Sequence, residues 1–268
     1  KKNYKVKGVC RQNKLIIKKF IDKKKFKNLD LANFDSLEKN LKYYRPDFVI
    51  NCAGIIKQKF KKYEKNNIFL INSSLPNFLS ILSVKFSFKL IHISTDCVFD
   101  GKIGNYKETS KPNSLDDYGL SKSLGEVFSE NCITLRTSII GHEFLQRNGL
   151  LEWFLNQKKI YGFKNAFFSG LTTLELSKVI ALLLKAKFKS GIYNVASKKI
   201  NKYELLMLIN QIYDKDIKIL PSTKFKIDRS LIGKKFERNY KIKISSWEKM
   251  IKEMKIYYYL NKKLYENI

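Results

Sequence analysis

Short apolar runs alternate with longer segments of helical periodicity through the first half of the chain. The runs that predict strands lie at residues 4–10, 26–29, 48–50, 90–93 and 132–135. Apolar positions recurring every three or four residues predict helices at residues 33–44, 68–84 and 117–129. Strands that are apolar throughout are typical of a parallel sheet with helices on both faces. This half of the chain therefore predicts a doubly wound α/β fold.

Beyond Gly141 the apolar pattern becomes less regular. Periodicity predicts helices at residues 150–157, 174–186, 203–213 and 246–257, and a strand at residues 192–195. The polar segment at residues 224–243 is interpreted as a connection. We expect a first region at residues 1–142 and a smaller α+β region at residues 143–268, with residues 172–196 returning to the first.

Composition places the chain among globular proteins. Its 268 residues are 44% hydrophobic and 29% charged, which excludes the disordered and fibrous classes. The longest unbroken apolar run, residues 179–184, is far shorter than the roughly 20 residues of a membrane-spanning helix. Residues 1–5 lack the apolar core of a signal peptide. We expect a cytoplasmic protein without a membrane partner.

The formal net charge is +29, from 53 basic and 24 acidic residues, and nucleic-acid binding is one hypothesis for it. Lysine supplies 47 of the basic residues and arginine only 6, although recognition of bases and phosphates favours the planar fork of arginine. Lysine is also absent from residues 66–84 and 123–157. We interpret the charge as lysine spread over tolerant surface positions and expect no nucleic-acid partner.

The cysteines and histidines do not form a metal-binding pattern. The four cysteines stand alone at Cys10, Cys52, Cys97 and Cys132. Each lies in or just after an apolar run, which is typical of reduced, buried thiols in a cytosolic α/β protein. The two histidines, His92 and His142, are too few for a histidine cage. We expect neither disulfides nor a metal site.

Two polar segments carry the candidate chemistry. Ser94, Thr95 and Asp96 follow a predicted strand, at the end where parallel sheets bind ligands. Tyr118 and Lys122 are four residues apart on a predicted helix and therefore share a face. A neighbouring ammonium favours the phenolate and would lower the pKa of the tyrosine from about 10, which suits acid–base catalysis. Because Thr95 stands at the strand end, the Tyr–Lys spacing is better evidence for a catalytic site than it would be alone.

The segments around these residues resemble the extended short-chain dehydrogenases/reductases, and most closely the dTDP-4-dehydrorhamnose reductase family. The resemblance rests on residues 46–54 (PDFVINCAG), 91–101 (IHISTDCVFDG), 118–126 (YGLSKSLGE), 135–141 (LRTSIIG) and 246–250 (SWEKM). It covers nearly the whole chain in order. The resemblance implies a Rossmann-type NAD(P)-binding domain at residues 1–142 and a substrate-binding region at residues 143–268.

The resemblance also implies roles for individual residues. Tyr118 would donate a proton to the C4 ketone of a nucleotide-linked 4-keto-6-deoxy sugar, Lys122 would tune Tyr118 and hold the nicotinamide ribose, and Thr95 would orient the carbonyl. The product would supply a deoxysugar for surface polysaccharide. The family pattern further implies cofactor contacts at Asp30, Leu31, Ala53, Gly54, Ile55 and Ser94, and a substrate contact at Asp96.

Three further residues bear on cofactor and substrate. Arg11 directly follows a strand, where a basic side chain can meet an adenosine 2′-phosphate, so we favour NADPH over NADH. Arg229 can meet the substrate diphosphate or form a structural salt bridge. His142 can reach substrate from a loop, although a plain loop histidine is the simpler interpretation. Trp153 and Trp247 are interpreted as packing residues.

One position separates related enzyme classes. Sugar-nucleotide 4,6-dehydratases usually carry Thr-Asp-Glu after this strand, whereas Cys97 stands third here, so the acid that eliminates water is missing. Cys97 is not expected to be a nucleophile because no basic residue is adjacent. A sugar-nucleotide epimerase and a non-catalytic nucleotide-binding regulatory subunit stay open as alternatives. The resemblance also leaves room for a homodimer.

The glycine-rich turn of this family is missing from the chain. No G-x-G-x-x-G sequence occurs in it, although such a turn holds the cofactor pyrophosphate at a helix N-terminus. By resemblance the first strand, its turn and the first helix are absent, and that strand would lie between those at residues 4–10 and 48–50. We expect a fragment that binds cofactor poorly and folds less well by itself.

Overall fold

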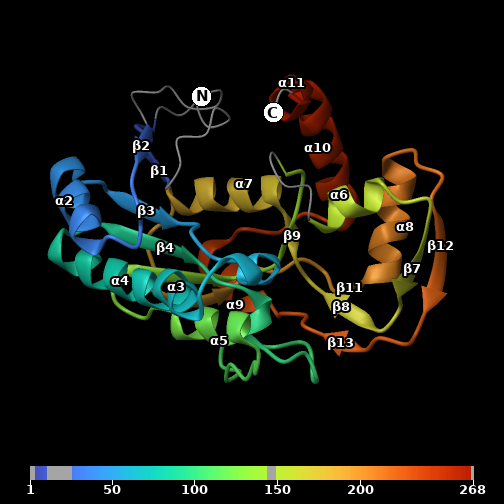
Figure 1. Ribbon diagram of the computed structural model, residues 1–268, viewed down its shortest axis with the longest axis horizontal. Coiled ribbons are helices and arrows are strands. Elements are labelled where there is room, and N and C mark those ends of the chain that lie inside the picture. The colour runs from blue at the N-terminus through green and yellow to red at the C-terminus, as the bar shows by residue number, and fades with distance from the viewer. Residues whose placement is uncertain (1–3, 11–25, 144–148, 267–268) are drawn as a thin grey trace.

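The computed structural model describes residues 4–10, 26–143 and 149–266. Its centre is a parallel sheet of four strands in the order β10–β5–β4–β3 (Figure 1). These strands are β3 (Phe48–Asn51), β4 (Lys89–Ile93), β5 (Cys132–Arg136) and β10 (Gly191–Asn194). Ile91 pairs with Ile50 on one side and with Ile133 on the other. The parallel pairing brings the carboxyl ends of the strands to one edge of the sheet.

Helices cover both faces of this sheet (Figure 1). One face carries α2 (Phe34–Tyr44), α3 (Lys65–Phe69), a π-helical turn (Leu70–Ser74), α4 (Leu75–Lys85) and α5 (Asp117–Leu124), and the other carries α7 (Thr173–Leu183). Leu90 belongs to an apolar cluster with Leu79 of α4, whereas the next residue, Ile91, clusters with Val179 of α7. Successive strand residues point to opposite faces, so a sheet covered on both sides requires the continuous apolar runs seen in the sequence.

A second, two-stranded parallel sheet precedes the central one. It consists of β1 (Gly8–Cys10) and β2 (Phe26–Asn28), which lie on the β3 side in Figure 1. Leu29, directly after β2, is buried in the same apolar cluster as α4. The chain then enters α2, where the Asn33 side chain accepts a hydrogen bond from the Ser36 backbone N–H at 2.9 Å and caps the helix.

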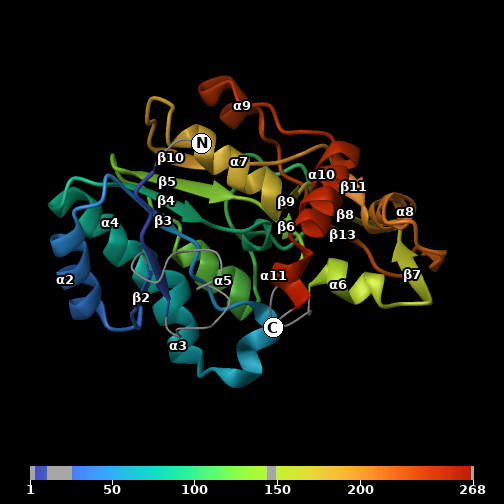
Figure 2. The same ribbon diagram turned by 90° about the horizontal axis from the view of Figure 1, so that it is seen from above.

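The second half of the chain builds a smaller α+β region beside the sheet (Figure 2). Its strands are β6 (Ile139–Ile140), β7 (Lys159–Phe163), β8 (Ala166–Phe168), β9 (Leu171–Thr172), β11 (Ile200–Asn201), β12 (Lys218–Ser222) and β13 (Ile227–Asp228). Its helices are α6 (Leu150–Leu155), α8 (Lys202–Ile212), α10 (Trp247–Leu260) and α11 (Lys262–Glu266). α9 (Lys234–Tyr240) lies against β10 of the central sheet instead. β7 pairs with β12, and β8 lies between β11 and β13. Between these elements the chain returns to the central sheet through β10.

The polar segment at residues 224–243 is more ordered than expected. Its interpretation as a plain connection is wrong, because β13 and α9 lie within it. Phe236 and Tyr240 of α9 are buried and contact the ring of Tyr193 on β10. These two apolar side chains stand among charged residues, so the mean hydropathy of the segment hides a helix that packs on one face.

Two local expectations also need correction. The helix expected over residues 117–129 ends at Leu124. The next residue, Gly125, lies so close to the Asn72 backbone that an added Cβ would be 2.0 Å from its carbonyl oxygen. All four cysteines are free, but Cys52 is exposed, whereas Cys132 is buried as expected.

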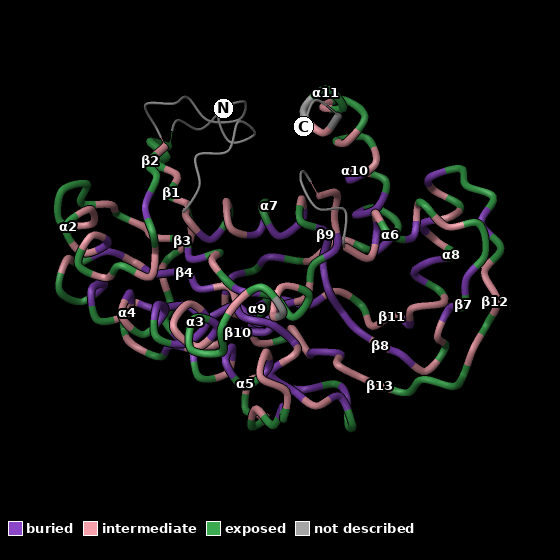
Figure 3. The backbone as a smooth tube through the Cα atoms, viewed as in Figure 1, coloured by how far each residue is buried: buried purple, intermediate pink, exposed green. Residues whose placement is uncertain are grey.

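One helical stretch of the described residues, Lys65–Lys85, passes a test of length and hydropathy for crossing a membrane. This stretch joins α3, the π-helical turn and α4. Leu75, Leu79 and Leu82 are buried in the cluster that faces the sheet, and Figure 3 shows the buried positions concentrated along the central strands and the helices against them.

Candidate active site

Thr95 lies at the carboxyl end of β4, where the chain turns into a 3-10 helix (Asp96–Val98). Its hydroxyl oxygen accepts from the Cys97 backbone N–H at 3.1 Å and caps this turn. The same hydroxyl donates to Asp96 Oδ1 at 3.2 Å. Thr95 and Asp96 are both buried, so the turn fixes two polar side chains at the strand end that parallel sheets use for ligands.

Tyr118 is brought to this strand end by the start of α5. The Asp116 side chain accepts from the Gly119 backbone N–H at 2.9 Å and begins the helix. Gly119 permits the close approach, because an added Cβ would lie 2.2 Å from the carbonyl oxygen of Cys97. The Thr95 side chain lies close enough to the Tyr118 phenol to act on its pKa. The structure thus joins the two residues that the sequence singles out for carbonyl chemistry.

The Tyr118 phenol is held in its neutral form. Burial raises its pKa above the usual value, nearby Cys97 and Asp96 add to this, and the Thr95 side chain opposes it. The expected lowering by Lys122 is wrong for this chain, because the ammonium points elsewhere and donates to the Ile93 carbonyl oxygen at 2.8 Å. A neutral phenol can donate a proton to a substrate oxygen.

Lys122 lies one helical turn after Tyr118 and is buried. Burial lowers its pKa to about 8, and the carboxylate of Glu126 opposes this shift. Glu126 Oε1 also accepts from the Ser94 hydroxyl at 2.9 Å. Glu126 therefore connects Ser94, a predicted cofactor contact, with Lys122.

A buried ion pair lies beneath the site and was missed by the sequence analysis. Arg136 donates to Glu126 twice, from Nε at 2.8 Å and from Nη2 at 2.6 Å. The two side chains are 2% and 4% exposed, and Arg136 lies 5.0 Å from the ring centre of Phe99. Both residues lie in the lysine-free segment at residues 123–157, and that absence of lysine was the sequence feature that indicated burial. The pair joins the end of β5 to the segment after α5.

Asn72, in the π-helical turn, holds a loop that the resemblance assigns to the cofactor. Its amide accepts from the Ile55 backbone N–H at 2.7 Å and donates to the Ile55 carbonyl oxygen at 2.9 Å. It also donates to the Ser121 hydroxyl at 3.0 Å. Asn72 is fully buried, and the sequence did not mark it because other asparagines and serines share its helical stretch. It couples Ala53, Gly54 and Ile55 to α5.

Replacing Asn72 with alanine should lower stability and loosen this loop. Two backbone groups of Ile55 lose their partners, so we expect a loss of about 2–4 kcal/mol in the free energy of unfolding. Urea unfolding measures this loss, and fluorescence titration with NADPH should show weaker binding. Asn77→Ala is the matched control, because Asn77 is exposed and donates only to carbonyls of Ser73 and Leu124. Equal losses in both variants would contradict the assigned role.

The residues present fit the nicotinamide end of a dinucleotide better than its other end. Buried Lys122 and the loop held by Asn72 lie at the carboxyl edge of the sheet. Asp30, by contrast, accepts from the Ala32 backbone N–H at 3.0 Å within its own turn, and Leu31 packs into the core. Among the described residues the positive-φ glycines lie elsewhere, at Gly101 and Gly104 in a loop and at Gly191 at the start of β10. Arg11 lies outside the described residues.

A cavity of about 410 Å³ opens beside Asp96. Arg229 lines it, while Nε donates to the Phe99 carbonyl oxygen at 3.0 Å and Nη1 lies 3.4 Å from Cys97 Sγ. Its Nη2 also lies 3.9 Å from Asp116 Oδ2, an ion pair of the kind that the structural interpretation expects, and a contact with the substrate diphosphate stays a prediction. Trp153 also lines the cavity and is 44% exposed, so its interpretation as a packing residue is wrong. Trp247, in contrast, is buried against Phe168.

Two other candidates do not join the site. His142 has both ring nitrogens engaged, with Glu152 at 2.7 Å and with the Tyr213 hydroxyl at 2.9 Å. It is stacked on Tyr258 of α10, so its interpretation as a substrate contact is corrected to a structural one. Burial raises the pKa of the Cys97 thiol to about 12, which agrees with the expectation that it is not a nucleophile.

This fold and site define a class of protein. A doubly wound parallel sheet with a threonine at a strand end, beside a tyrosine and a lysine one turn apart, is the arrangement of Rossmann-type short-chain dehydrogenases/reductases. Within that class the chain belongs to the family described as the RmlD substrate binding domain, whose profile matches residues 9–259.

Individual relatives agree with this family. A dTDP-4-dehydrorhamnose reductase from Aggregatibacter actinomycetemcomitans is 33% identical over 118 residues, 42% of this chain and 40% of the relative. The beta subunit of methionine adenosyltransferase 2 from Xenopus tropicalis is 28% identical over 102 residues, 38% of this chain and 30% of the relative. The matches thus span less than half of the length of these relatives.

One solved structure shares the fold over most of its length. The dTDP-4-dehydrorhamnose reductase of Bacillus anthracis, solved in complex with NADP, superposes with a TM-score of 0.75 at 20% identity. The superposition covers 90% of this chain and 94% of that one. The likeness establishes the Rossmann-type fold of the chain.

Proposed function

We propose that the protein reduces the C4 ketone of a nucleotide-linked 4-keto-6-deoxy sugar, with NADPH as the cofactor. The observation that carries this proposal is that Thr95, buried at the end of β4, lies beside the neutral Tyr118 phenol at the sheet edge, next to the cavity that Asp96 lines. Membership of the RmlD substrate binding domain family and the NADP complex of the Bacillus anthracis enzyme support it. The product would serve deoxysugar and surface polysaccharide synthesis.

The chain's own residues divide the chemistry between them. The Thr95 and Tyr118 hydroxyls together bind the carbonyl oxygen of the substrate and fix its orientation. Tyr118 then gives its proton to that oxygen as negative charge develops on it. The Lys122 ammonium, which donates to the Ile93 carbonyl oxygen, would bind the nicotinamide ribose. The cofactor, when bound, supplies the hydride that the carbonyl carbon receives.

The test follows oxidation of NADPH by the protein as its gene encodes it. dTDP-4-dehydrorhamnose and UDP-linked 4-keto amino sugars are offered in turn, each with NADPH and with NADH. We expect loss of NADPH absorbance with at least one of these substrates. A folded protein that binds NADPH and oxidises it with none of them would reject the proposal.

A second candidate function is a non-catalytic regulatory subunit. The match to the methionine adenosyltransferase beta subunit favours it, whereas the joined Thr95 and Tyr118 favour catalysis. Purification from native cells separates the two: a stable partner protein without reductase activity would support the regulatory role.

Three sequence-based expectations stay predictions. They are the division near residue 142, a cytoplasmic location and a homodimer. Size-exclusion chromatography with light scattering tests the last of these.

A further inference from the structure

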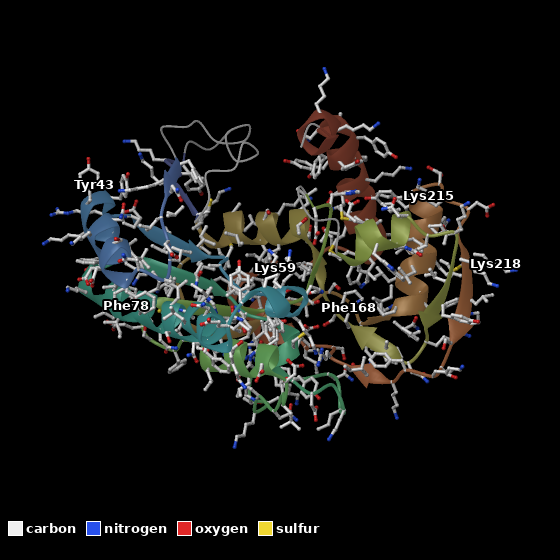
Figure 4. The ribbon with its side chains drawn as sticks, viewed as in Figure 1. Tyr43, Lys59, Phe78, Phe168, Lys215 and Lys218 are labelled. Carbon is white, nitrogen blue, oxygen red and sulfur yellow. The ribbon has the colours of Figure 1, made fainter. Side chains whose placement is uncertain are left out.

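Lys202 is a half-buried lysine that the sequence analysis did not single out. It is the first residue of α8, after the capping residue Asn201, and it lines the cavity beside Asp96. Its Nζ lies 3.7 Å from the ring centre of Phe168, a residue labelled in Figure 4 between the central sheet and the region of β7, β12 and α8. In the described parts of the chain no acceptor lies within hydrogen-bond distance of this Nζ.

The helix end disfavours a cation at this position, although the Phe168 ring attracts it. A cation in the first turn of a helix opposes the helix dipole, which is positive at that end. Burial lowers the pKa of Lys202 to about 8, and Asp96 opposes the shift by attraction across the cavity. No ion pair joins the two side chains among the described residues. A half-buried ammonium without protein acceptors leaves its donors available to a ligand that supplies acceptors.

The cavity is graded from an aromatic mouth to a charged floor. Tyr161 and Phe225 at the mouth are 62% and 48% exposed, whereas Phe168 and Asp96 on the floor are each 5% exposed. A nucleotide-linked sugar has the same order along its length: a flat base, a diphosphate and a sugar. Aromatic side chains suit the base, cations suit the diphosphate, and Asp96 adjoins the Thr95 hydroxyl that faces the sugar.

We propose that Lys202 binds the diphosphate of the nucleotide-linked substrate and that the protein takes up a proton there on binding. This inference rests on the proposed function and refines it. Arg229 lines the same cavity, but its Nε and Nη1 already donate to Phe99 and Cys97. Lys202 has its donors free for phosphate oxygens and is therefore the main diphosphate ligand, with Arg229 as a second charge.

The proton uptake follows from the position of the ammonium. Because its pKa is lowered to about 8, part of the Lys202 population is neutral before binding at mildly alkaline pH. A diphosphate beside the amine favours its charged form and raises its pKa, so binding takes up protons at that pH. Near pH 6 the side chain is already charged, and the uptake there should vanish.

Titration calorimetry with dTDP and with UDP, in two buffers of different ionisation enthalpy, measures affinity and proton uptake together. Lys202→Met should weaken binding by about 10- to 100-fold and remove the uptake. Lys202→Arg should keep most of the affinity and also lose the uptake, because arginine stays charged. Lys215→Met is the control, since Lys215 is an exposed side chain labelled in Figure 4, and it should match the wild type.

The outcomes separate the two proposals. Wild-type affinity in Lys202→Met, or uptake unchanged in Lys202→Arg, would overturn the role of Lys202 even if the protein reduces keto sugars. A dTDP or UDP complex with uptake that depends on Lys202 supports the role even if no keto sugar is reduced. Lys202→Arg also guards against misfolding, because a folded variant that binds without uptake shows the effect directly.

Discussion

Replacing Tyr118 with phenylalanine should lower kcat for keto-sugar reduction by about 10²- to 10⁴-fold. The variant keeps the ring and its packing against Phe60 but removes the proton that the substrate oxygen receives. Burial holds this phenol neutral across the physiological range, so the wild type always presents the donor form. The KM for the keto sugar should change less, because the Thr95 hydroxyl still binds its carbonyl. Stopped-flow and steady-state assays of NADPH oxidation measure both.

The control for this variant is Tyr240→Phe. Tyr240 is also buried, and its hydroxyl donates to the Lys189 carbonyl oxygen at 2.7 Å, in the cluster with Tyr193. Its loss should lower stability slightly and leave kcat unchanged. If Tyr118→Phe turned over within a factor of about two of the wild type, Tyr118 would not be the proton donor. NADPH affinity should stay unchanged in both variants.

The sequence predicted the parts of the fold that a single segment specifies. The strands β3, β4 and β5 are continuous apolar runs because helices cover both of their faces. The polar residues at the end of β4 and the Tyr118–Lys122 spacing marked the site, because each is fixed within a few residues of chain. The confirmed family and fold follow from these local signals.

What the sequence did not show depends on contacts between distant segments. Lys202 meets Asp96 and Phe168 only after β11 has joined the sheet of β8. A lysine in a chain with 47 of them carries no signal of its own. The pKa of Tyr118 also depended on tertiary structure: spacing placed Lys122 on its helix face, but the ammonium satisfies the Ile93 carbonyl oxygen instead. A four-residue spacing on a helix places two residues on the same face, but it does not determine where their side chains point.

Removing the charge of Glu126 should be the most destabilising single change near the site. Glu126→Gln leaves Arg136, whose side chain is 2% exposed, without its carboxylate, and we expect a loss of about 3–5 kcal/mol in the free energy of unfolding. The amide keeps one oxygen that can accept from Ser94, but its NH2 group replaces the oxygen that accepts from Arg136 Nη2. Urea unfolding followed by circular dichroism measures the loss. Because the pair joins β5 to the segment after α5, kcat should fall along with stability.

The double variant Glu126→Leu/Arg136→Met distinguishes the pair from its individual charges. Two buried charges cost desolvation that their attraction only partly returns, so apolar side chains in both places should recover most of the stability lost in Glu126→Leu alone. Glu248→Gln is the exposed control: its pair with Lys252 on α10 is solvated, and the urea midpoint should not move. A double variant as unstable as the sum of its single variants would mean that the two residues stabilise the fold independently. Recovery of stability without recovery of kcat would assign the pair to the positioning of Ser94 and Lys122.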